Sequence, residues 1–130
     1  MGFDFGTRRI GVAYGQSLTG TARPLPVLAA RDGIPDWQLL QRLISNWQPD
    51  VLVVGLPYNM DGTDGDMVQR ATRFANRLHG RFHLPCYGMD ERLSSHAAAE
   101  LSDKPIGEPL DSLAAQLILE SWFAELGARR

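Results

Sequence analysis

Carboxylates stand at two places in this sequence where a charge is unexpected. Asp4 lies inside an apolar strand, between Phe3 and Phe5, where a charged group is costly unless it has a partner. Asp90 and Glu91 follow directly after a second short strand. Because neighbouring residues of a strand face opposite sides, only one of these two can share a site with Asp4 if the strand continues that far. The pattern leaves open which of the two it is.

A third carboxylate, Asp111, stands near the start of the last predicted helix. Ala115, Ile118 and Trp122 follow it at +4, +7 and +11, and these positions form the apolar stripe that should pack on a sheet. Asp111 therefore lies on the inward-facing side of the helix. An ordinary first-turn Asp that stabilises the helix dipole explains its position along the helix but not its face.

These carboxylates could form one site, because the active edge of a parallel sheet lies at the carboxyl ends of its strands. Three carboxylates that meet there repel one another unless a cation holds them. Hard divalent cations such as Mg²⁺ take oxygen ligands, and two such ions can activate a water and stabilise the leaving oxygen of a phosphodiester. The competing interpretation is structural: Asp4 bonds the following turn, and Asp90 and Glu91 lie in a solvated loop with Arg92 as their ion-pair partner.

The basic residues are almost all arginine, since only Lys104 among the thirteen is lysine. Arginine is the better bidentate phosphate clamp, although a GC-rich genome gives the same bias. Four arginines form one stripe beside the buried face of a predicted helix, and such a stripe either tracks a phosphate backbone or is a solvated flank. They are Arg70, Arg73, Arg77 and Arg81.

Composition limits the class of protein. The chain has 130 residues, 44% hydrophobic and 22% charged, which is typical of a single globular domain spanning residues 1–130. A net charge of −2 excludes a protein that holds nucleic acid by global positive charge. No apolar stretch is long enough to cross a bilayer, and the start has no secretory pattern. With Cys86 as the only cysteine, we expect a cytoplasmic protein without a disulfide or membrane association.

Periodicity and turn residues predict a mixed α/β fold. Two prolines confine the third strand to a sheet edge, and the β-branched run after Asp50 predicts a strand buried on both faces. The predicted strands are Gly2–Gly6, Ile10–Gly15, Ala22–Ala30, Val51–Val54 and Pro85–Met89, and the predicted helices are Pro35–Trp47, Asp66–His79, Ser94–Leu101 and Leu110–Leu126, with loops at Gly55–Gly65 and Asp103–Pro109.

Five motifs, in order, resemble the YqgF/RuvX family and together span nearly the whole chain. They are Gly2–Ala13 (GFDFGTRRIGVA), Thr21–Leu25, Val54–Gly62, Asp90–Leu93 (DERL) and Leu110–Ala115 (LDSLAA). Members of that family are described as Holliday junction resolvases and as nucleases for the 5′ end of pre-16S ribosomal RNA. The motifs are much more specific together than any one of them alone.

The resemblance implies a ribonuclease H-like fold, with a five-stranded mixed sheet in which strand two is antiparallel and helices flank the sheet. It also implies that Asp4, Glu91 and Asp111 are the catalytic residues and hold Mg²⁺ or Mn²⁺. The choice of Glu91 over Asp90 rests on the family pattern alone. The sequence departs from the family pattern in one respect. Met1 lies only three residues before Asp4, so that very few residues precede Asp4 in the first strand.

The function expected from these features is metal-dependent endonucleolytic cleavage of structured RNA or branched DNA, either at the 5′ end of pre-16S rRNA or at Holliday junctions. Arg8, Arg9 and Arg92 would steady phosphates, and the loop from Tyr58 to Gly62, with Asn59, would contact the substrate. Arg73 and Arg77 of the stripe are further candidates for nucleic-acid binding. We expect a monomer or weak homodimer.

Two other function classes fit part of the sequence. Asp4-Phe5-Gly6-Thr7 followed by Ile10-Gly11 resembles the phosphate-binding hairpin of actin-like ATP-binding proteins, but those proteins need two such domains to close over the nucleotide. The other alternative is a non-catalytic module that binds RNA or protein and keeps this fold. Three intact carboxylates at motif positions count against that alternative.

Overall fold

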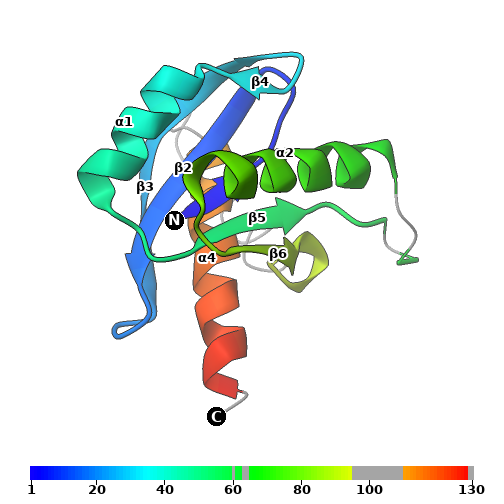
Figure 1. The fold of residues 1–130 in the computed structure, drawn as a ribbon. Coiled ribbons are helices and arrows are strands. Elements are labelled where there is room, and N and C mark those ends of the chain that lie inside the picture. Colours follow the sequence, from blue (N-terminus) through cyan, green and yellow to red (C-terminus); the bar gives the residue numbers. More distant parts are fainter. Residues whose placement is uncertain (60, 63–64, 95–109, 129–130) are drawn as a thin grey trace.

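The computed structural model describes residues 1–130 except residues 60, 63–64, 95–109 and 129–130. One mixed sheet holds the described strands in the order β4-β3-β2-β1-β5-β6, and helices pack on both of its faces (Figure 1). The elements are β1 (Gly2–Asp4), β2 (Arg9–Gln16), β3 (Thr21–Arg31), β4 (Ile34–Pro35), α1 (Trp37–Trp47), β5 (Leu52–Leu56), α2 (Asp66–Phe82), β6 (Cys86–Asp90), the 3₁₀ helix η1 (Glu91–Ser94) and α4 (Leu110–Ala128).

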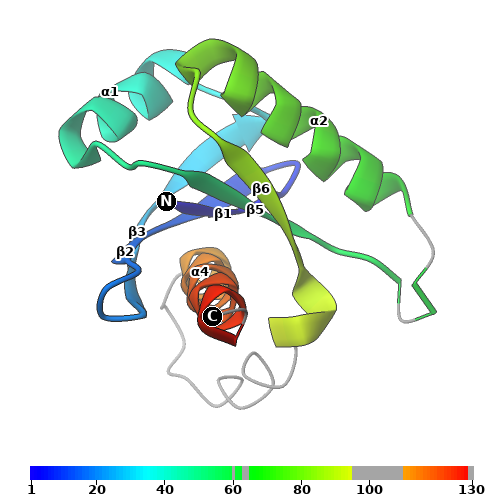
Figure 2. The ribbon, with the colours of Figure 1, turned by 60° about the horizontal axis from the view of Figure 1, so that its bottom comes forward.

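The helices divide the molecule into three layers. Figure 2 shows α1 and α2 on one face of the sheet and α4 on the other. Phe3 and Phe74 meet edge-on in the core under α1 and α2, with ring centroids 5.7 Å apart. Ala115 and Ile118 lie in the second core, between α4 and the sheet, which confirms the inward-facing stripe predicted for the last helix.

The central strand β1 has only three residues, yet it joins the two halves of the sheet. It pairs antiparallel with β2, where Asp4 lies opposite Gly11, and parallel with β5, where Phe3 lies opposite Val54. The antiparallel second strand predicted by the family resemblance is therefore present. Val53 and Val54 are fully buried on opposite faces of β5, as the β-branched run predicts.

In the described part of the chain the sheet has six strands rather than the predicted five, because the chain makes an extra hairpin after β3. Asp32 and Gly33 have φ values of 52° and 80°, the left-handed conformation that a two-residue hairpin turn requires and that an Asp-Gly pair favours. The turn brings β4 against the end of β3, where Arg31 lies opposite Ile34. Among the described residues, the proline-containing part of β3 has no strand on its outer side, as predicted for an edge.

Three helix boundaries differ from those predicted, and the simplest is the end of α4, which continues beyond Leu126 to Ala128. Pro35 lies in β4 and not in the first turn of α1, because Asp36 caps that helix by accepting the backbone N–H groups of Gln38 and Leu39 at 3.0 and 3.3 Å. Helix α2 continues beyond His79 to Phe82. The predicted helix Ser94–Leu101, apart from its first residue, and the loop Asp103–Pro109 lie outside the described residues.

None of the helices in the described part of the chain could span a lipid bilayer, because each is too short or too polar.

Candidate functional site

The side chains of Asp4 and Glu91 meet at one edge of the sheet. Asp4 is the last residue of β1, and Glu91 directly follows β6. Both strands run parallel to β5, so their carboxyl ends lie at the same edge. The Asp4 and Glu91 carboxyl groups share a hydrogen bond. We call these two residues the acidic pair.

Asp4 faces α4, as strand alternation requires. Gly2, two residues earlier, lies against α4 so closely that a Cβ atom there would come 2.9 Å from Cβ of Leu119. Phe3 faces the opposite way, into the core under α1 and α2. The Asp4 carboxyl group therefore lies on the α4 side of the sheet, where it is half-buried.

Gly55 of β5 makes room for the Glu91 side chain. A Cβ atom on Gly55 would lie 2.6 Å from Oε1 of Glu91 and 2.5 Å from Cδ1 of Ile118 in α4, both closer than unbonded atoms approach. Continuing the β1–β5 register places Gly55 beside Asp4. The missing side chain of Gly55 thus creates the space in which the acidic pair meets. The sequence placed Gly55 in a family motif and at the start of a predicted loop, and neither indicates this role.

Burial raises the pKa of the Glu91 carboxyl, the nearby negative charge of Asp90 raises it further, and the hydrogen bond with Asp4 partly opposes both effects. Two half-buried carboxyl groups in contact are a donor set that a hard divalent cation fits. Within the described residues no group of three His, Cys, Asp or Glu side chains could hold a metal ion.

Asp111 is the predicted third carboxylate. Its backbone lies in the first turn of α4, and its side chain is outside the described residues. The next residue, Ser112, is fully buried and donates its hydroxyl to the Leu25 carbonyl of β3 at 2.6 Å. Four residues after Asp111, the Ala115 carbonyl reaches β1, 3.2 Å from the position of a Cβ on Gly2. These contacts hold the Asp111 backbone over the sheet face that bears the acidic pair.

Asp90 faces away from the acidic pair toward Arg92. Its Oδ2 accepts from Nη2 of Arg92 at 2.6 Å, and its Oδ1 accepts from the Arg92 backbone N–H at 2.9 Å. The hydrogen bonds from Arg92 hold the pKa of Asp90 below its usual value. The ion pair considered as a structural alternative thus involves Asp90, and Glu91 is the residue that meets Asp4.

Arg92 also contacts the loop that follows β5. Its guanidinium lies over the Tyr58 ring, 5.6 Å from the centroid, and Nη1 lies 3.3 Å from the position of a Cβ on Gly62. Within this loop the Gly62 N–H donates to the Asn59 carbonyl at 2.8 Å, and the Asn59 side chain is exposed. The loop therefore lies against the turn that carries Glu91, at the edge predicted from the sequence.

Arg8 and Arg9 are exposed where the chain passes from β1 to β2. The Arg8 carbonyl accepts the Ala30 N–H at 2.8 Å, which ties this connection to β3. Arg9 begins β2 two residues before Gly11, the partner of Asp4. Both arginines therefore lie at the same end of β1 as the acidic pair.

The four arginines of α2 differ in their surroundings. Arg70 forms ion pairs with Asp32 at 3.3 Å and with Asp66 at 3.0 Å, and Arg81 lies over the Trp37 ring at 4.2 Å. Arg73 and Arg77 are exposed, and neither has an ion-pair partner among the described residues. Of the four arginines in the predicted stripe, Arg70 is neutralised by carboxylates and Arg81 stacks on an aromatic ring. The other two are unbalanced, which means that they have neither kind of partner among the described residues.

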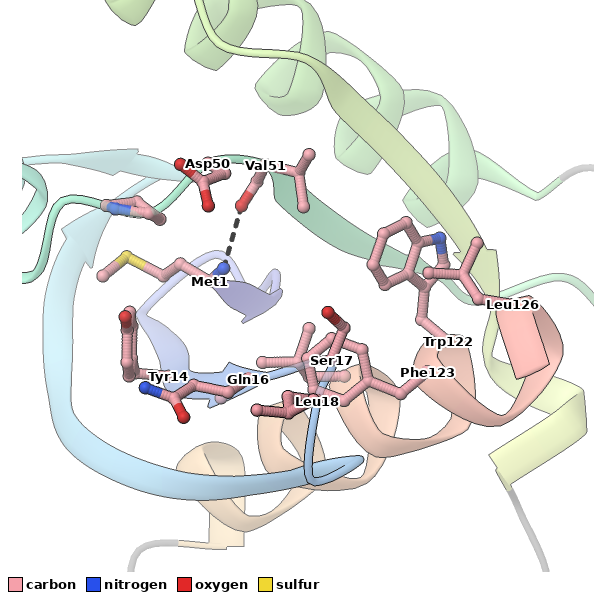
Figure 3. Close-up of a pocket in the computed structure, with 13 residues that line it drawn as sticks. Met1, Tyr14, Gln16, Ser17, Leu18, Asp50, Val51, Trp122, Phe123 and Leu126 are labelled. Atoms are coloured by element: carbon pink, nitrogen blue, oxygen red, sulfur yellow. Dashed lines mark hydrogen bonds between the residues drawn. The ribbon is translucent and has the colours of Figure 1, made fainter.

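A pocket of about 480 Å³ lies at the opposite end of β1 (Figure 3). Met1 and Asp50 line it on one side and Trp122 and Phe123 of α4 on the other, and the Met1 amino group donates to the Val51 carbonyl at 2.9 Å. Met1 and Asp4 lie at opposite ends of β1, so this pocket and the acidic pair do not share residues. The acidic pair instead lies at a sheet edge, an arrangement that suits a polymeric substrate.

Comparison with known proteins places the chain in a family. Residues 1–125 match the RuvX family, described as Holliday junction resolvase. The chain belongs to the RuvX family. Relatives named "Putative pre-16S rRNA nuclease" include one from Azotobacter vinelandii, 53% identical over 96% of this chain and 92% of the relative, and one from Chromohalobacter salexigens, 54% identical over 96% and 88%. The predicted family and nuclease class are confirmed, and the protein is an enzyme that hydrolyses nucleic acid.

Solved structures confirm the fold class. Thermus thermophilus RuvC in complex with a Holliday junction substrate superposes with a TM-score of 0.61 at 17% identity, over 97% of this chain and 94% of that chain. The yeast mitochondrial Holliday junction resolvase Ydc2 gives a TM-score of 0.57 at 14% identity, over 99% and 80%. Both share the ribonuclease H-like fold expected from the sequence motifs.

Proposed function

We propose that this RuvX-family protein is a metal-dependent endonuclease whose substrate is the 5′ end of pre-16S rRNA. The observation that carries the proposal is the hydrogen-bonded acidic pair at an open sheet edge. The rRNA substrate is favoured by relatives of 53–54% identity that carry this name over most of their length. The resolvase structures share 17% identity or less with the chain, so they support the fold and leave junction cleavage as the second candidate.

Asp4, Glu91 and Asp111 would hold Mg²⁺ or Mn²⁺. A divalent cation bound there would supply Lewis acidity to a phosphodiester and lower the pKa of a water molecule. Asp4 and Glu91 offer the carboxylate oxygens, and Gly55 keeps the space in which they meet. Asp111 would complete the ligand set from the first turn of α4.

Residues around this edge would position the substrate. Arg8 and Arg9 are exposed beside the acidic pair and suit contacts with phosphates on either side of the cleaved bond. Asn59 offers an exposed amide on the neighbouring loop. Arg92, paired with Asp90 and lying over Tyr58, would keep that loop against the site and would contact a phosphate of the substrate.

The expected setting of this activity is the cytoplasm, where bacterial rRNA precursors are processed, with the protein acting as a monomer or weak homodimer. A native mass measured with and without bound RNA tests the oligomeric part of this proposal.

The test compares a pre-16S 5′-end RNA with a four-way DNA junction, each incubated with Mg²⁺, with Mn²⁺ or with chelator. We expect the parent to cleave the RNA only with a divalent cation, and Asp4→Asn and Glu91→Gln to abolish cleavage. Asp50→Asn is the matched control, because Asp50 is an exposed carboxylate at the other end of the sheet. Cleavage in chelator, or by Glu91→Gln at the parent rate, contradicts the acidic site, and cleavage of the junction alone contradicts the rRNA substrate.

A further inference from the structure

A second, smaller pocket lies on the opposite face of the sheet from the acidic pair, between α2 and the turn that joins β3 to β4. Its volume is about 220 Å³. We call it the arginine pocket; its lining includes Phe5, Gly33, Ile34, Arg70, Arg73 and Arg77. The function proposed for the acidic pair does not account for this pocket.

The wall formed by the β3–β4 turn is fixed in place from two directions. The Gly33 N–H donates to the Thr7 carbonyl at 2.8 Å, and Asp32 forms an ion pair with Arg70 of α2 at 3.3 Å. A Cβ on Gly33 would come 2.7 Å from Cζ of Phe5, so the glycine lets the turn lie directly against the Phe5 ring. The pocket is therefore formed before any ligand arrives.

The pocket combines unbalanced positive charge with an apolar surface. Arg70 is neutralised by Asp32 and Asp66, whereas Arg73 and Arg77 have no ion-pair partner in the described part of the chain. Ile34 is 49% exposed, and with Phe5 it supplies the apolar side. An anionic group beside an apolar surface matches one nucleotide, with its phosphate on the arginines and its base on the apolar side.

The route between the acidic pair and the arginine pocket favours a flexible strand. Phe5 directly follows Asp4, but their side chains lie on opposite faces of the sheet. The connection that carries Arg8 and Arg9 lies at that edge. A strand in contact with both places has to turn around the sheet edge. A duplex, with a persistence length of about 150 base pairs, resists such a turn, and an unpaired strand does not.

We propose that the arginine pocket holds a nucleotide of an unpaired strand next to the scissile phosphate, so that the enzyme requires a single-stranded flank on one side of its cleavage site. This inference rests on the proposed nuclease function for its biological meaning, but the binding it describes does not need catalysis. Binding can therefore be measured in chelator, where a failure of the proposed cleavage has no effect on the result.

The experiment measures fluorescence anisotropy of a labelled single-stranded oligoribonucleotide of about ten nucleotides and of a blunt duplex of the same sequence, in chelator, over a range of salt concentrations. For Arg73→Gln/Arg77→Gln on the single strand, we expect the slope of log Kd against log salt to fall by about 0.7, since the pocket holds one phosphate and each phosphate neutralised on a single strand contributes about 0.7. Ile34→Ser should weaken binding severalfold and leave the slope unchanged, because it removes apolar surface and no charge. Arg42→Gln, an exposed arginine of α1, is the control and should match the parent.

An unchanged slope in Arg73→Gln/Arg77→Gln overturns the proposal, because the arginines then hold no phosphate of the strand. Equal loss of duplex and single-strand binding also overturns it, because the arginines then follow a duplex backbone. If Ile34→Ser binds the single strand as the parent does, the pocket takes only an anion and no base. Cleavage of the pre-16S substrate, scored separately, reports on the nuclease function itself.

Discussion

Replacing Gly55 with Ala tests whether the acidic pair is assembled as the structure shows. The added Cβ would lie 2.5 Å from Cδ1 of Ile118, which is 1% exposed, and 2.6 Å from Oε1 of Glu91. Ile118 cannot move without disturbing the core under α4, so we expect an overpacking cost of about 1–3 kcal/mol. For a domain of this size that lowers the melting temperature by about 3–5 °C per kcal/mol. Glu91 should also be pushed away from Asp4.

Gly80→Ala is the matched control for this substitution. Gly80 lies in helix α2, and a Cβ there meets nothing within 4 Å, so alanine should stabilise the protein by about 0.4–1 kcal/mol. Melting curves of both variants are recorded in chelator and with Mn²⁺. We expect Gly55→Ala to melt lower and to lose most of the Mn²⁺ stabilisation, and Gly80→Ala to keep it. If Gly55→Ala melts like the parent and responds equally to Mn²⁺, the described packing of Glu91 and Ile118 on Gly55 is wrong.

Three further predictions follow from the site and its surroundings. Glu91→Gln should melt at or above the parent temperature in chelator, because it removes a half-buried charge beside Asp90. Mn²⁺ at ten times its Kd should stabilise the parent by about 1.4 kcal/mol and the variant much less. Equal Mn²⁺ responses would contradict a ligand role for Glu91. Burial raises the pKa of the Cys86 thiol to about 11 from 9.0. Alkylation of this thiol at pH 8 should therefore be about a hundredfold slower in the folded protein than in urea. Similar rates in the two conditions would contradict this thiol environment. ATP with Mg²⁺ should raise the melting temperature no more than Mg²⁺ alone; a larger shift would favour the actin-like alternative over the nuclease.

Strand alternation and sheet geometry were enough to predict Asp4 of the acidic pair and to limit its partner to two residues. They place Asp4 at the carboxyl end of β1 and allow only one of Asp90 and Glu91 to join it, and the structure shows that Glu91 does while Asp90 binds Arg92. They could not say which, because the choice depends on where β6 ends, and one residue more or less exchanges the two faces. The third carboxylate, Asp111, remains a prediction.

Other features depend on contacts between residues far apart in the sequence, and periodicity carries no information about those. Spacing alone predicted one stripe on α2, but Arg70 is neutralised by Asp32, thirty-eight residues away, and Arg81 lies over the Trp37 ring. Among the described residues, Arg73 and Arg77 have a partner of neither kind. The space at Gly55 exists because Ile118 of α4 and Glu91 both approach it. The sixth strand is different, because the Asp32-Gly33 pair is a local hairpin signal from which this strand is predictable.

The position of β5 explains why the site and the fold depend on the same residues. Asp4 and Glu91 lie on β1 and after β6, and these two strands do not pair with each other; each pairs with β5, which lies between them. Since β1 has only three residues, its place is fixed largely by Phe3, which is fully buried and packs against Phe74 of α2. The geometry of the acidic pair is therefore set by a strand buried on both faces and by an aromatic contact on the face that the acidic pair does not occupy. The acidic pair is in this way held in place by the fold and is still only half-buried, as a site for a long substrate would require.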